Sequence, residues 1–180
     1  MPDLTIRLKR HPDHTASLSC TRRDGSVTWQ RQRGSLGAVF PPHDLTHYAV
    51  EQTLGFQRGF YGLIADGWAI EDFAKPWPRG PIPTEAQEVE LIVGFFDTER
   101  RGDLALTSDT FREHVTRYLA ARQATKAKMA TLTGVRPLSD EDLERVRSSR
   151  AELLESWWNT LPGYSLDLEF NRGVPVSVLR

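Results

Sequence analysis

The chain has 180 residues, of which 39% are hydrophobic and 26% charged, and this balance excludes a disordered polypeptide. The length allows a sizeable hydrophobic core, so we expect a single domain over residues 1–180. The formal net charge is −1, which gives no overall positive field to attract a nucleic acid or an anionic membrane.

The first third of the chain has the alternating pattern of β-strands. Leu4, Ile6 and Leu8 alternate with polar residues, as expected for a half-buried strand. A second strand is predicted over 16–22, and Asp24-Gly25 then supplies a hairpin turn before a third strand over 26–32. These segments predict a three-stranded antiparallel meander.

The single cysteine and the lack of a recognisable signal peptide or membrane span in the sequence favour a cytoplasmic, soluble chain. Cys20 is the only cysteine, and its place in the strand pattern predicts a small buried residue rather than a nucleophile. No apolar stretch follows Met1-Pro2-Asp3, so we expect no signal peptide. No apolar window reaches the length of a membrane span.

Helices are expected to follow the strands. The first is predicted from Pro42 or His43 to about Leu54, with Gly55 ending it. The segment 57–73 is rich in aromatics and glycines, and it fits either a short helix broken by Gly67 or a packed loop. A proline-rich connector over 75–83 is expected to be extended.

Three further helices are predicted in the second half of the chain. Thr84 and Gln87 form the pattern of a capping box for a helix that ends near Arg101. Another helix is expected from about 107–110 to about Ala130. Ser139 and Asp142 predict a cap for the last one.

The C-terminal segments 164–170 and 174–179 predict a β-hairpin. Strands at both ends of the chain therefore enclose a helical middle. The fold class that follows is α+β: an antiparallel sheet from an N-terminal three-stranded meander and a C-terminal hairpin, with about four helices packed on it.

The stretch "PPHDLTHYAVEQ" at 41–52 carries the densest set of ionisable groups. With His43 at 0° and about 100° per residue, His47 lies near 40°, Glu51 near 80° and Asp44 near 100° on the helical wheel. Apolar residues flank this arc. The pattern favours a polar site in the interior of the protein over a solvated helix face.

The spacing also suits metal binding. Residues four apart lie one above the other, so His43 and His47 can direct nitrogens at one ion. Glu51 would complete the ligand set or orient a histidine, and Asp44 would act on a bound water. Glu88, from the helix predicted over 84–101, is the preferred additional ligand. The cofactor expected from this set is a divalent metal, zinc or another transition metal.

The letters "HDLTH" resemble the HExxH motif of zinc metallopeptidases, with Asp44 at the place of the general-base glutamate. This resemblance implies a further ligand downstream, for which Glu71 is a candidate. The same letters resemble the HDxxH element of the ubiquinone-biosynthesis accessory family, where Gly59 stands at the position of that family's following glutamate. More broadly, "PPHDLTHYAVE…GFYGLIADGW" resembles a family of uncharacterised bacterial proteins, which implies a bacterial origin.

Two functional hypotheses follow from the sequence. In the first, the chain is a metal-dependent hydrolase whose site lies on the first helix. In the second, it is a non-enzymatic ligand-binding or protein-assembly module, and the His/Asp/Glu quartet is a structural hydrogen-bond network. Aromatics of 59–77 would line a ligand pocket or belong to the core. The expected partner is a small molecule or a peptide, with no nucleic acid and no membrane, and homo-oligomerisation is left open.

Overall fold

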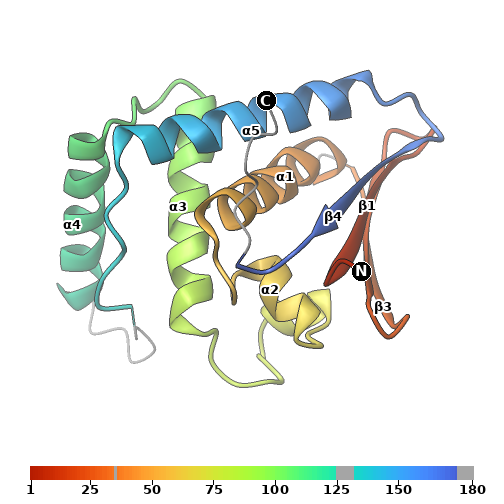
Figure 1. The fold of residues 1–180 in the computed structure, drawn as a ribbon, viewed down its shortest axis with the longest axis horizontal. Coiled ribbons are helices and arrows are strands. Elements are labelled where there is room, and N and C mark those ends of the chain that lie inside the picture. Colours follow the sequence, from red (N-terminus) through yellow and green to blue (C-terminus); the bar gives the residue numbers. More distant parts are fainter. Residues whose placement is uncertain (35, 125–131, 174–180) are drawn as a thin grey trace.

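The computed structural model describes residues 1–34, 36–124 and 132–173. Their order along the chain is strands, helices and a final strand (Figure 1). The elements are β1 (Leu4–Arg10), β2 (Ala16–Arg22), β3 (Val27–Gln32), α1 (Leu36–Leu54), α2 (Phe60–Ala65), the 3₁₀ turn η1 (Ile70–Phe73), α3 (Thr84–Arg100), α4 (Ser108–Ala124), α5 (Asp140–Asn159) and β4 (Ser165–Phe170).

The four strands form one antiparallel sheet in the order β3-β2-β1-β4. Ile6 of β1 pairs with Cys20 of β2 on one side and with Leu168 of β4 on the other. The N-terminal meander and the C-terminal strand therefore share a sheet, which confirms the predicted α+β class. The second strand of the predicted hairpin, 174–179, lies outside the described residues.

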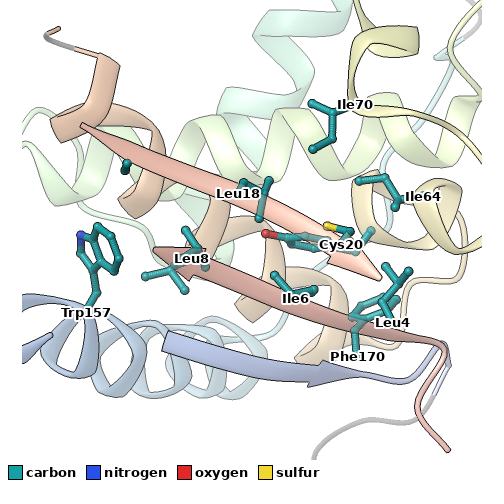
Figure 2. Packing of buried hydrophobic residues seen from close by; sticks show 12 residues of the cluster. Leu4, Ile6, Leu8, Leu18, Cys20, Ile64, Ile70, Trp157 and Phe170 are labelled. Carbon is teal, nitrogen blue, oxygen red and sulfur yellow. The ribbon is translucent and has the colours of Figure 1, made fainter. Parts of the chain in front are cut away.

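One face of the sheet packs against a hydrophobic core. Leu4, Ile6 and Leu8 point into it, and Trp157 of α5 packs against the same cluster (Figure 2). Cys20 lies there too with no exposed surface, so the prediction of a buried structural cysteine is confirmed.

Helix α1 contributes residues to this core and to a second one. In Figure 1 it lies between the sheet and α3. Leu45 belongs to the cluster on the sheet side, whereas Ala49 and Val50 belong to the cluster formed with α3, α4 and α5. Because apolar layers cover both sides of α1, its polar side chains are also drawn into the interior. This placement determines the environment of the candidate site.

Helix α1 begins at Leu36, about two turns before the predicted start at Pro42 or His43. Pro41 and Pro42 lie inside the helix, which gives up two backbone hydrogen bonds. Tertiary packing outweighs this loss: a Cβ on Gly37 would lie 3.0 Å from the carbonyl oxygen of His14, so the first turn is pressed against the β1–β2 loop. The proline signal misplaced the helix start for that reason.

The N-terminal caps predicted for α3 and α5 have different outcomes. Helix α3 spans nearly the predicted residues, but Pro83 is its N-cap and no side chain caps it, so the predicted capping box is wrong. Ser139 and Asp142 do form the predicted box at α5. The predicted end of α4 near Ala130 lies outside the described residues.

The segment 57–73 contains the short helix of the first alternative. α2 ends at Ala65, and Gly67 follows with a φ of +95°, a conformation that favours glycine. Among the described residues, none of the helices has the length and apolar composition that a membrane crossing requires.

Candidate metal centre

Three residues of the polar arc of α1 are buried, as the helical wheel predicts, whereas the side chain of His43 is 25% exposed. Asp44 is 5% exposed, His47 4% and Glu51 0%. A buried ionisable group is costly unless it has a polar partner, so each of these side chains should be engaged by the protein. The partners come from β3, α2 and α3.

The two imidazoles lie against each other and meet a carboxylate from α3. The ring centroids of His43 and His47 are 4.8 Å apart, and their planes cross at 82°. One ligand atom from each of His43, His47 and Glu90 can be chosen so that all three lie within 4.8 Å of one another. This group could hold a metal ion.

A second carboxylate of α3 orients His43. Nδ1 of His43 lies 2.8 Å from Oδ2 of Asp97, which leaves Nε2 as the available ligand atom. Thr46 donates a hydrogen bond to Oδ1 of Asp97, and Arg100 lies 3.7 Å from the same oxygen. Burial opposes ionisation of Asp97, but these neighbours outweigh it, so its pKa is lowered. Asp97 is therefore an anionic acceptor for Nδ1–H.

His47 lies between two carboxylates. Its Nε2 is 3.1 Å from Oε2 of Glu90, and its buried Nδ1 is 3.5 Å from Oε1 of Glu51 with no closer hydrogen-bond partner. Burial alone would lower the pKa of His47, but Glu51 and Glu90 favour the cation and raise it to about 10. Each imidazole thus has its Nδ1 close to a carboxylate that is not part of the group, Asp97 for His43 and Glu51 for His47.

Glu51 is occupied by the backbone of α2. Its carboxylate accepts hydrogen bonds from the N–H groups of Tyr61, at 3.1 Å, and Gly62, at 3.2 Å. Gly59 makes this approach feasible, because a Cβ there would lie 2.4 Å from Cδ of Glu51. The structure places Glu51 behind His47 and outside the His43–His47–Glu90 group.

Asp44 is held by a residue of β3. Gln32 of β3 donates a hydrogen bond to its Oδ2 at 2.7 Å. Burial is the main influence on Asp44 and raises its pKa to about 6, although Gln32, His43 and His47 act in the opposite direction. Asp44 and His43 both line a small cavity.

Glu88 is not brought to the imidazoles. It accepts a hydrogen bond from the backbone N–H of Arg136 and lies 3.3 Å from that guanidinium. On a helical wheel centred on Val89, Glu88 and Glu90 fall about 100° to either side, so periodicity alone did not decide between them. Glu71, implied by the peptidase resemblance, is exposed in η1 and outside the group.

The sequence did contain a signal for the two acidic residues of α3 at the site. Glu90 and Asp97 are seven residues apart, so they share one side of the helix. Two acids on one flank of an apolar stripe match two histidines on the neighbouring helix. The sequence does not say which flank of α3 faces α1, because this depends on how the two helices pack in the structure.

Two cavities meet at the group. The smaller has a volume of about 290 Å³ and is lined by Asp44, His43 and Gln32 among others. The larger has a volume of about 710 Å³ and is mainly apolar. His47, Glu90, Phe60 and Phe73 line both. The aromatics of 59–77 thus contribute to a pocket through Phe60 and Phe73 and to the core through Tyr61, which is fully buried.

Comparison with known proteins gives no assignment. No family model matches the chain, and neither a curated protein nor a solved structure matches it significantly. The function is therefore argued from the geometry of this site.

Proposed function

We propose that the chain binds a divalent transition metal through His43, His47 and Glu90 and acts as a metal-dependent hydrolase. The observation that carries this proposal is the meeting of three ligand atoms within 4.8 Å, where two cavities join. The hydrolase hypothesis keeps the two histidines of the sequence motif and replaces Glu88 by Glu90.

The ligand set supports a catalytic rather than a purely structural ion. Two imidazoles and one carboxylate are a common ligand set of catalytic zinc, and other transition metals accept it too. Such a site leaves coordination positions for water and substrate. The Asp97 carboxylate accepts the Nδ1 hydrogen of His43 and would orient that ring towards an ion. Glu51 lies 3.5 Å from Nδ1 of His47, and the cationic ring of His47 would release its Nε2 proton when the metal binds.

In the proposed hydrolysis, the smaller cavity would hold the attacking water and the larger cavity the substrate. A bound metal supplies an acidified water and polarises the bond to be broken. Asp44 lines the smaller cavity, where its carboxylate would accept the proton of the attacking water and pass it to the leaving group as the bond breaks. Gln32 holds that carboxylate in place. The larger cavity would receive the substrate.

Elemental analysis of protein purified without an affinity tag tests the metal site. Variants of Glu88 and Glu90, two glutamates of α3, are compared with the wild type. We expect close to one zinc or other transition metal per chain in the wild type and in the Glu88→Gln variant. Glu90→Gln should lose most of it, because only Glu90 belongs to the group. Metal that is absent from the wild type even after incubation with Zn²⁺, or equal in the two variants, would refute the proposal.

The competing interpretation is a structural network, favoured by the fact that His43, His47 and Asp44 each have a partner in the protein. Thermal unfolding with and without Zn²⁺ separates the two. A metal site predicts that Zn²⁺ raises the midpoint of the wild type but not of Glu90→Gln. A purely structural network predicts no response to Zn²⁺ in either protein.

A further inference from the structure

We infer that the larger cavity receives an elongated, mainly apolar small molecule whose polar reacting group lies at the metal centre, between two apolar arms. This inference rests on the proposed function for the position of the reacting group. The occurrence of an apolar ligand can be tested without metal.

The length of the cavity follows from the face of α3 that lines it. Gln87, Glu90, Gly94 and Thr98 all line the cavity at spacings of three or four residues, so they form one row along the helix. At about 1.5 Å per residue the row is about 16 Å long. Glu90 lies about 4 Å from one end and about 12 Å from the other. The candidate metal group therefore lies within the row and not at either end of it.

Apolar side chains line the cavity on both sides of Glu90. Towards the N-terminal end of α3, Phe73 and Ile82 pack with Ala86. Towards its C-terminal end, Phe95 contacts α4 through Phe111, and Tyr118 of α4 lines the same cavity. Flat aromatic walls on both sides favour rings or hydrocarbon chains as occupants.

Charge argues against a peptide or a nucleotide. Apart from Tyr118, the described residues that line the larger cavity include only three ionisable side chains, His47, Glu90 and Arg122. Two of these belong to the candidate metal group. Polar side chains of the described residues along the arms are few, namely Gln87, Thr98, Tyr118 and Arg122, so a peptide backbone or a phosphate chain would lose more hydration than these groups replace. The volume of about 710 Å³ lies within the range of small-molecule sites.

Three probes test the inference by isothermal titration. Acetohydroxamate and 3-phenylpropanohydroxamate share a metal-binding head group and differ in the apolar arm, and 4-phenylbutan-1-ol carries the arm without the head group. We expect the zinc-loaded protein to bind the phenyl hydroxamate about tenfold or more tightly than the methyl one. Equal affinities would overturn the inference.

A cavity-filling variant locates the arm. A Cβ on Gly94 meets nothing within 4 Å, so Gly94→Leu should place its side chain in the cavity without a clash. It should abolish the gain from the phenyl group, whereas Gly134→Leu, at an exposed glycine that does not line the cavity, should retain it. Retention of the gain in Gly94→Leu would overturn the placement.

The alcohol separates the two proposals. If the protein binds no metal, neither hydroxamate gains from zinc, but the metal-free wild type should still bind 4-phenylbutan-1-ol and Gly94→Leu should not. In the other case zinc binds, the alcohol does not bind, and the phenyl hydroxamate binds no more tightly than the methyl one. The proposed function then survives and the inference fails.

Discussion

Nδ1 of His43 lies 2.8 Å from Oδ2 of Asp97, and this contact joins α1 to α3 beside Glu90. An ionised carboxylate can only accept a hydrogen bond, so Nδ1 of His43 carries a proton and Nε2 is the nitrogen left to bind an ion. On the proposed function, this contact would orient His43 so that Nε2 faces the metal.

Replacing Asp97 by Asn should therefore weaken metal binding without removing a ligand. We expect Asp97→Asn to lower the affinity for Zn²⁺ by about 10- to 100-fold, as measured by competition with a chromophoric chelator. Asp103→Asn, on the exposed loop after α3, is the control and should match the wild type. An Asp97→Asn protein with wild-type affinity would show that this contact does not orient a ligand.

The close approach of α2 to its preceding loop gives a stability prediction. A Cβ on Gly62 would lie 2.1 Å from the carbonyl oxygen of Gln57, which is backbone and cannot rotate away. We expect Gly62→Ala to lower the free energy of unfolding by about 1–3 kcal/mol in urea denaturation. It should also weaken zinc binding, because the N–H of Gly62 holds Glu51 behind His47.

Gly94→Ala is the matched comparison, since Gly94 is also a helical glycine but has open space at its Cβ. This change should raise the free energy of unfolding by about 0.5–1 kcal/mol, because alanine loses less backbone entropy in a helix. If the two variants were equally stable, the tight packing of α2 described above would be incorrect.

The sequence predicted the fold well because its signals were local. Alternation in Leu4, Ile6 and Leu8 is a property of one strand, and the capping box of Ser139 and Asp142 is a property of one helix end. The start of α1 was mispredicted because it depends on contacts of Gly37 with residues far along the chain. Long-range packing outweighed the local proline signal there.

The part of the candidate site that lies on one helix was also predictable from the sequence. His43, Asp44, His47 and Glu51 share one arc of one helix, so the wheel brought them together. It correctly predicted burial for Asp44, His47 and Glu51. Their partners on α3 depend on the rotation of that helix about its axis, and Glu88 and Glu90 were equivalent by periodicity. Glu51 was separated from the group by backbone N–H groups of α2, a kind of partner that side-chain patterns do not reveal.

Acid sensitivity can be predicted at the contact between α3 and α5. Burial would raise the pKa of Glu99, but the hydrogen bond from Arg147, with N–O distance 2.7 Å, and other neighbours outweigh it and lower the pKa below its ordinary 4.5. A carboxyl whose pKa is lower in the folded state stabilises the protein above its unfolded pKa, and this contribution is lost as the pH falls below about 4.5.

Glu99→Gln should therefore cost about 1–3 kcal/mol of unfolding free energy at pH 7, and the difference from wild type should shrink as the pH is lowered through 4.5. Glu144→Gln removes the other, exposed carboxylate beside Arg147 and should cost less than about 0.5 kcal/mol. Urea titrations at several pH values check both. A difference independent of pH would contradict the role of the Glu99 charge.

The buried thiol gives a kinetic prediction. Cys20 has no exposed surface, and burial raises the pKa of its thiol, so the reactive thiolate is suppressed. A disulfide reagent such as Ellman's reagent should label the unfolded chain in guanidinium at once, and the native chain only at the rate at which it opens. Rapid labelling of the native protein would mean that the sheet core is accessible.

X-ray absorption at the zinc edge tests the central claim most directly, because it counts the ligands of the bound ion. For the wild type loaded with one Zn²⁺, we predict a nitrogen and oxygen shell at about 2.0–2.2 Å and scattering from two imidazoles. His47→Ala should retain one imidazole or lose the metal. A spectrum with no imidazole scattering, or one that His47→Ala leaves unchanged, would contradict a metal centre built on His43, His47 and Glu90.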